Sequence, residues 1–129
     1  MPRTRHTTLN CSPGCTVEAT LELFGGKWKA LILYHLFEEP VLRFGEFRHR
    51  LPNVTQRMLT NQLRELEADG LVSRTVFPVV PPHVEYRLTD LGKTLKPVIQ
   101  ALKTWGDQYA HSPEREKRLK QDQSAQITA

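Results

Sequence analysis

Four polar side chains between residues 57 and 64 have the types and the spacing needed to recognise nucleic-acid bases. Arg57, Thr60, Asn61 and Arg64 follow one another at intervals of three, one and three residues, which places them on one face of an α-helix. Arginine can donate two hydrogen bonds to guanine, asparagine can bridge the edge of adenine, and threonine can contact a thymine methyl group or a phosphate. An ordinary solvated helix face has the same appearance, so the surrounding elements are needed to choose between the two interpretations.

A helix running from Thr55 to Gly70 is predicted to carry these side chains. Thr55 is a suitable N-cap, because its hydroxyl can accept a hydrogen bond from an otherwise unpaired amide of the first turn. Gly70 is a suitable end, because glycine readily adopts the left-handed conformation that follows many helices. Leu59, Leu63 and Leu66 recur at helical spacing and predict a buried stripe, which turns the polar residues toward solvent.

The charges of this helix are arranged against its dipole. Within this helix no acidic residue occurs before Glu65, and its acidic residues Glu65, Glu67 and Asp69 all lie in the second half. The helix dipole favours acidic residues first and basic residues last. We therefore expect the first half to meet an anion, with Gln56 as an alternative to asparagine for bridging adenine.

The preceding residues predict the rest of a helix-turn-helix. Helices are expected at residues 16–24, 27–37 and 43–51, with a short strand at residues 41–42. Pro-Asn at 52–53 makes a tight connection into the helix that begins at Thr55. Two helices joined in this way, the second polar and basic on its outer face, form the helix-turn-helix pattern.

A change of period after Gly70 predicts a β-hairpin. Residues 71–77 are rich in valine, threonine and phenylalanine, and residues 84–88 alternate between apolar and polar. The prolines at 78, 81 and 82 prevent strand pairing in the segment between the two strands, so the tip of the hairpin should be long and stiff. The expected fold is mainly α with a small β-hairpin (α+β): a winged helix-turn-helix with dimerisation helices at both ends.

The last apolar stripe is longer than a small core needs. It steps four, three, four, three and four residues along a helix expected to begin at the cap Thr89, and Pro97 should kink or loosen that helix. A heptad-like stripe favours a seam against a second chain, although a helix folded back on its own domain also explains it. The stripe consists of Leu91, Leu95, Val98, Leu102, Trp105 and Tyr109.

Basic residues outside the Thr55 helix are candidates for contacts with DNA phosphates or with the minor groove. The first group is Lys27, Lys29, Arg48 and Arg50, and the hairpin group is Arg74, His83 and Arg87. For each residue the alternative is a base that is merely exposed to solvent. Phosphate contacts would make binding depend on salt, whereas base contacts would make it depend on sequence.

Length and composition suit one globular domain. The 129 residues carry a net charge of +4 and a pI near 9.3, compatible with a polyanionic partner. We expect a loose arm at residues 1–14, a DNA-binding and dimerisation domain at 15–111, and a polar tail at 112–129 that is mobile or forms a frayed helix extension. No apolar run approaches the roughly 18 residues of a membrane span, and the basic N-terminus lacks the apolar segment of a secretory signal. We expect no membrane association and a cytoplasmic location.

No enzyme site, cofactor or metal is expected. The sequence has no glycine-rich phosphate loop and no recognisable catalytic pair. Cys11 and Cys15 lie too close in sequence to staple a domain and should be thiols in a reducing compartment. Cys15 stands at a helix N-terminus, which favours a reactive thiolate, but a resting structural cysteine fits equally well. With His6 the two cysteines offer only three irregularly spaced metal ligands.

Four motifs, in order and spacing, resemble the HxlR type of transcriptional regulator. They lie at residues 15–29, 42–47, 55–71 and 80–89, and the similarity covers about residues 15 to 108. The resemblance implies a bacterial or archaeal homodimer with a winged helix, distantly akin to MarR-type regulators, that binds double-stranded DNA. Members commonly dimerise through their first and last helices, which adds Val17 and Leu21 to the predicted interface.

The resemblance also implies a regulatory role for Cys15. Some members use the matching cysteine to sense oxidants, quinones or other electrophiles. The family often has Cys-Pro at this point, whereas this chain has Cys15-Thr16 and a second thiol at Cys11. The expected function is a homodimeric regulator of a pseudo-palindromic operator, more commonly a repressor than an activator, with an unidentified effector. A winged helix used only for protein interactions is the alternative, and the basic face with Arg57 and Arg64 argues against it.

Overall fold

The computed structural model describes residues 13–128 and divides into two units, one ending at Thr94 and the other beginning at Leu95. Of the expected N-terminal arm at 1–14, only Pro13 and Gly14 lie within the described residues, where they form a turn. None of the described helices is both long and apolar enough to cross a membrane.

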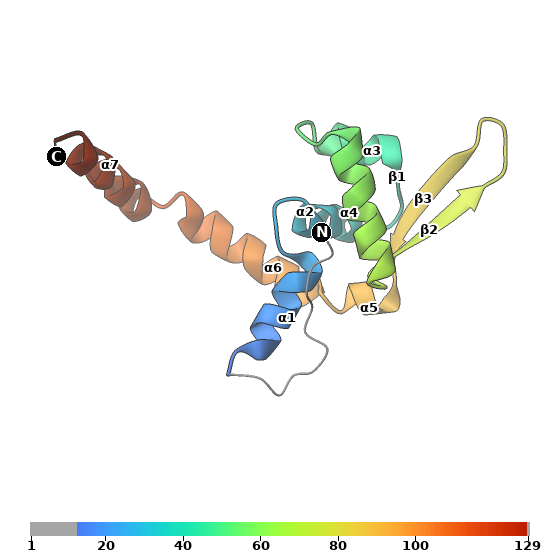
Figure 1. The fold of residues 1–129 in the computed structure, drawn as a ribbon, viewed down its shortest axis with the longest axis horizontal. Coiled ribbons are helices and arrows are strands. Elements are labelled where there is room, and N and C mark those ends of the chain that lie inside the picture. The colour runs from blue at the N-terminus through green and yellow to red at the C-terminus, as the bar shows by residue number, and fades with distance from the viewer. Residues whose placement is uncertain (1–12, 129) are drawn as a thin grey trace. The chain divides into compact units, whose positions relative to one another are not determined.

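The N-terminal unit has the winged helix-turn-helix architecture that the sequence predicts. Its sheet is antiparallel in the order β1-β3-β2, with Leu42 opposite Tyr86 and Val72 opposite Leu88. The hairpin of β2 and β3 extends away from the helices of this unit (Figure 1). In chain order the elements are α1 (Cys15–Phe24), α2 (Lys29–Glu38), β1 (Leu42–Arg43), α3 (Phe44–Arg50), α4 (Gln56–Ala68), β2 (Val72–Phe77), β3 (His83–Leu88) and α5 (Asp90–Lys93).

The core of this unit forms where α2, α3 and α4 meet the sheet. The Phe47 and Tyr86 rings meet edge to face, with centroids 5.9 Å apart, and join α3 to β3. Burying one large apolar side chain stabilises the fold by roughly 1.5 to 3 kcal/mol, so the whole set holds the helices firmly on the sheet. The other fully buried members include Ile32, Leu33, Leu36, Leu42, Leu59, Leu63, Leu66, Leu71 and Val72.

Helix α4 begins and ends where its sequence predicts. The Thr55 hydroxyl accepts a hydrogen bond of 3.1 Å from the backbone N–H of Met58, as expected of an N-cap. Gly70 has φ +76°, and the N–H of Leu71 returns to the carbonyl of Leu66 at 3.0 Å. This closing turn needs the left-handed conformation that glycine adopts at little cost.

The C-terminal unit consists of α6 (Lys96–Trp105), the π-helix η1 (Gly106–Ala110) and α7 (Pro113–Thr128). The single helix predicted after Thr89 is wrong, because α5 stops at Lys93 and a new helix starts after Leu95. Pro97 lies in the first turn of α6, where its missing N–H leaves no bond unmade. The interruption at Thr94 and Leu95, just before Pro97, agrees with the local loosening that the sequence predicts.

Candidate nucleic-acid interface

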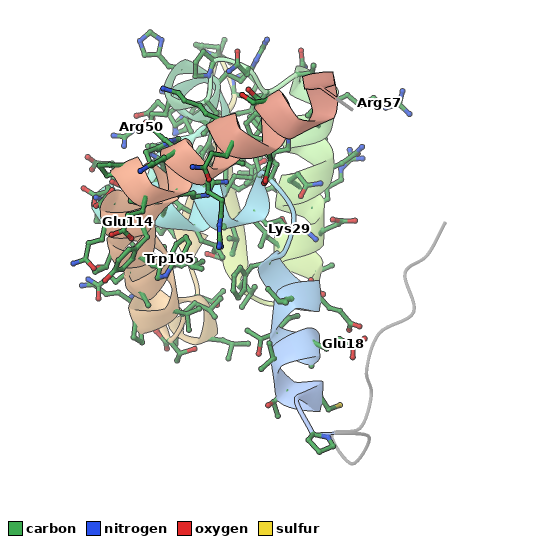
Figure 2. All side chains as sticks on the ribbon, turned by 90° about the vertical axis from the view of Figure 1, so that its left-hand side faces the viewer. Glu18, Lys29, Arg50, Arg57, Trp105 and Glu114 are labelled. Carbon is green, nitrogen blue, oxygen red and sulfur yellow. The ribbon has the colours of Figure 1, made fainter. Side chains whose placement is uncertain are left out.

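Helix α4 presents an exposed polar face that begins in its first turn and continues to Arg64. Because Leu59, Leu63 and Leu66 are buried, helical geometry directs the opposite side to solvent. Arg57 projects outward from this helix (Figure 2). The helix thus brings together on one surface all the residues predicted to recognise bases: Thr55, Gln56, Arg57, Asn61 and Arg64 are exposed, and Thr60 is half-buried beside them.

The start of α4 favours an anion. Its first turn contains no acidic residue, and the N-terminal end of a helix carries partial positive charge. The Thr60 hydroxyl donates to the carbonyl of Gln56 at 2.8 Å, so its hydrogen is used within the helix while its methyl group remains for a ligand. This surface suits phosphates and base edges.

Lys29 does not lie on that surface, and its prediction as a phosphate contact is wrong. Its side chain is 1% exposed, and its Nζ lies 2.6 Å from Oε2 of Glu65 on α4; Figure 2 shows its place in this unit. Position 29 shares a face of α2 with the buried Ile32, Leu33 and Leu36. Its place on the helix therefore decides its burial, and Glu65 supplies the opposite charge that a buried ammonium requires.

Lys27 and Arg48 remain exposed, as contacts with phosphates would require. The Nζ of Lys27 lies 4.7 Å from the centroid of the Trp28 ring, a cation–π contact that steadies the side chain without removing its charge. Both residues keep their positive charge available to a polyanion.

Arg50 is exposed but engaged with α2. Its Nη1 lies 3.5 Å from Nδ1 of His35, and its Nη2 lies 4.0 Å from Oε2 of Glu39. Burial lowers the pKa of His35, the nearby charge of Arg50 lowers it further, and Glu38 opposes the shift. The lowered pKa favours the neutral form of His35 beside Arg50. Arg50 would have to leave this contact to reach a phosphate.

The basic residues of β3 are offset by an acid. Glu85 Oε1 accepts a hydrogen bond of 2.8 Å from Nη2 of Arg87, and Glu85 Oε2 lies 3.4 Å from Nε2 of His83. His83 also stacks on Phe77, with centroids 4.6 Å apart and planes inclined by 22°. Both predicted residues lie on the wing, but Glu85 makes β3 less attractive to phosphates than two basic residues alone would be.

A groove of about 360 Å³ lies between α4 and the hairpin. Arg64 and Glu67 line it from α4, Arg74 lines it from β2, and Tyr86 lines it from β3. Arg74 Nε lies 3.2 Å from Oε2 of Glu67. Burial raises the pKa of Tyr86, and the guanidinium groups of Arg74 and Arg64 oppose that rise. Two positive charges and a phenol thus meet beside the exposed polar face of α4.

Glu65 and Glu67 have roles that the sequence alone did not reveal. Each forms an ion pair with another element, Glu65 with Lys29 of α2 and Glu67 with Arg74 of β2. The sequence contained one signal of these roles: both acidic residues lie beside the buried stripe, at the end of the helix where the dipole disfavours negative charge. That signal does not identify the partners, which lie far away in the sequence.

The residues predicted for dimerisation expose apolar surface in both units. In α1, Val17 and Leu21 are 63% and 53% exposed. In the C-terminal unit the Trp105 and Tyr109 rings lie with centroids 5.7 Å apart. Contiguous exposed apolar groups of this kind indicate an interaction surface. The C-terminal set comprises the exposed Val98, Leu102, Trp105 and Tyr109, with Leu95 half-buried.

Cys15 is the first residue of α1, and its side chain is 3% exposed. It is disulfide-bonded in this structure, where the sequence predicted a thiol. Gly14 precedes it with φ +89°, a conformation that glycine adopts readily, and so sets Cys15 at the helix N-terminus. Cys11 and His6 lie outside the described residues.

Sequence comparison identifies the family. The profile described as HxlR-like helix-turn-helix matches residues 23–114. The HTH-type transcriptional regulator YdeP of Bacillus subtilis (strain 168) is 57% identical over 96 residues, which cover 74% of each chain. An HTH-type transcriptional regulator of Methanothermobacter thermautotrophicus is 50% identical over 100 residues, covering 78% of this chain and 76% of its own.

Solved structures agree with this assignment. The redox regulator HypR in its oxidized form has a TM-score of 0.69 and 55% identity, over 72% of this chain and 95% of HypR. The reduced form of the transcriptional regulator YodB from B. subtilis has a TM-score of 0.65 and 35% identity, over 78% of this chain and 96% of YodB. The helix-turn-helix of these regulators implies binding to DNA, and the matched proteins are regulators and not enzymes. The chain belongs to the HxlR family of helix-turn-helix transcriptional regulators.

Proposed function

We propose that this regulator binds a pseudo-palindromic operator as a homodimer and represses transcription from the cytoplasm by blocking polymerase. The observation that carries the proposal is the exposed polar face of α4, whose first turn contains no acidic residue. The major groove is wide enough to admit a helix. Two-fold pairing of the chain would set two such helices about 34 Å apart, one helical turn of DNA.

Each polar residue of α4 then has a distinct task. Arg57 donates to guanine, Asn61 or Gln56 bridges adenine, and Thr60 offers its methyl group to thymine. Arg64 lies one turn further along the helix and binds the backbone. The exposed Lys27 and Arg48 add phosphate contacts, which position the protein without carrying sequence information.

A gel shift against the DNA flanking the regulator's own gene tests this function. At about 150 mM salt, promoter DNA should bind more tightly than random duplex of the same length, because non-specific electrostatic binding is weak at that salt concentration. Equal affinity for both would refute sequence-specific recognition. It would favour a winged helix that serves protein interactions.

The dimer is proposed to form through α1 and the apolar stripe of the C-terminal unit, within a domain that spans residues 15–111. The support is the exposure of Leu21 and of Leu102, each slightly more than half exposed. Leu102→Glu should give a monomer in sedimentation experiments and weaken operator binding, whereas Leu119→Glu, outside the stripe, should do neither. A Leu102→Glu protein that sediments as a dimer would refute this interface.

We further propose that oxidants or electrophiles weaken operator binding through Cys15. The support is the disulfide at Cys15 and the likeness to HypR, a redox regulator, and to YodB, solved also after diamide treatment. Diamide or a quinone should lower operator affinity of the intact protein. Cys15→Ser should abolish that response and keep full affinity in reductant; an unchanged response would refute the role of Cys15.

A further inference from the structure

The ion pair between Glu67 and Arg74 occupies the groove beside the face of α4 that is proposed to recognise bases. Their side chains are 41% and 46% exposed, and the atoms are 3.2 Å apart. Exposed pairs of this kind are weak, because water and salt screen both charges. Arg74 can therefore leave the carboxylate of Glu67 and bind another anion at little cost in free energy.

The position of α4 does not depend on that pair. Lys29 and Glu65 already join α4 to α2 through a contact of 2.6 Å with a fully buried ammonium, and the leucine stripe of α4 fills the core. Losing the contact between Glu67 and Arg74 should therefore leave α4 in place. The Glu67–Arg74 pair can therefore open to bind a ligand without loss of the fold.

The groove is continuous with the face that reads bases. Gln56, Thr60 and Arg64 belong to that face and also line the groove, with Arg74 and Tyr86 on the hairpin side. Burial raises the pKa of Tyr86, so the phenol stays protonated and can donate a hydrogen bond. Two guanidinium groups and a hydroxyl offer the donors that a phosphate requires.

We propose that this groove binds one phosphate of the DNA backbone, and that Glu67 competes with that phosphate for Arg74. In free protein Arg74 pairs with Glu67; on DNA it turns to the phosphate together with Arg64. The proposal rests on the proposed function, since α4 must enter the major groove for the flanking backbone to cross this site. Glu67 thereby limits the affinity of the regulator for DNA of any sequence.

Charge-neutral variants of the pair test the competition, with binding to random duplex and to promoter DNA measured over a range of salt. Glu67→Gln should tighten both complexes by up to about fivefold, the strength of an exposed pair. Arg74→Gln should weaken both and reduce the slope of log affinity against log salt by about 0.9, the value of one phosphate. In the Arg74→Gln background, Glu67→Gln should have a much smaller effect.

Glu38→Gln makes the same change in net charge at an exposed position of α2 and serves as the control; it should tighten binding less than Glu67→Gln. Circular dichroism and the urea midpoint confirm that each variant folds. Weaker binding by Glu67→Gln, or an unchanged salt slope in Arg74→Gln, would overturn the proposal. If either result is found while wild-type protein still prefers promoter DNA over random duplex, only the proposed phosphate site is refuted. If wild-type protein shows no such preference, the proposed function is refuted.

Discussion

Removing one or the other partner of the Lys29–Glu65 ion pair should destabilise the protein by very different amounts. The Lys29 side chain is 1% exposed, whereas that of Glu65 is 44% exposed. In Glu65→Leu the ammonium stays buried and loses the carboxylate that lies 2.6 Å away. In Lys29→Met the carboxylate can turn to solvent, and methionine fills the buried space with an apolar chain of similar length.

The sizes of the two effects follow from this asymmetry. Leaving one charge of a buried pair uncompensated costs about 3 to 5 kcal/mol. We expect Glu65→Leu to lower the free energy of unfolding by about 3 kcal/mol, the lower end, because water already screens the half-exposed carboxylate. Lys29→Met should change it by at most about 1 kcal/mol, since no buried charge remains. The double variant should recover most of the loss.

Urea denaturation at fixed protein concentration and in reductant measures these differences. Glu67→Leu is the matched control, because it removes an acid two residues along the same helix from an exposed pair and should cost at most about 1 kcal/mol. Equal losses in Lys29→Met and Glu65→Leu would refute the reasoning. So would a double variant as unstable as Glu65→Leu alone.

Three further predictions concern other parts of the N-terminal unit. Gly92→Ala should lower the free energy of unfolding by about 1 to 3 kcal/mol, because a Cβ there would collide with the backbone carbonyl of Leu71; an unchanged urea midpoint would contradict this. Burial and Arg50 lower the pKa of His35, so the unfolded chain binds this proton more readily, and stability should fall as pH drops from about 7 to 5. His35→Gln should flatten that decline in denaturation curves measured across the range, and an identical decline would exclude His35 as its source. Arg57→Ala should weaken operator binding by about 1 to 3 kcal/mol and relax the preference at one base pair; titrations with single-base operator variants test this, and uniform weakening would assign Arg57 to a phosphate.

Helix α4 shows how much of the fold a sequence can predict. Its cap at Thr55, its buried stripe and its stop at Gly70 all depend on residues within one or two turns of each other, and the structure contains each of them. The hairpin strands are confirmed to within about one residue for the same reason, since alternation and prolines are local signals. Local chemistry therefore predicted the elements that present the candidate site.

Two errors show where local reasoning fails. The charge of Lys29 predicts an exposed side chain, although its spacing from Ile32 and Leu36 puts it on the buried face of α2. Its partner Glu65 is on another helix and has no local signal. The helix predicted to continue from Thr89 is divided into α5 and α6, with Pro97 in the first turn of the second. The burial of Lys29 depends on tertiary packing, which can override a residue's average preference.

The contacts of Glu65 and Glu67 explain why the acidic residues of α4 lie in its second half. Acids in the second half of a helix oppose its dipole, at a cost of roughly 0.3 to 1 kcal/mol each. Glu65 compensates a buried ammonium whose isolation would cost far more, and Glu67 meets the wing. Through Glu65 the second half of α4 thus holds the helix in place, while the first half presents its donors and its positive end to solvent. Because Arg57 and Asn61 lie in the first half and Glu65 in the second, substitutions at Arg57 or Asn61 should alter base preference while leaving the stability of the fold nearly unchanged.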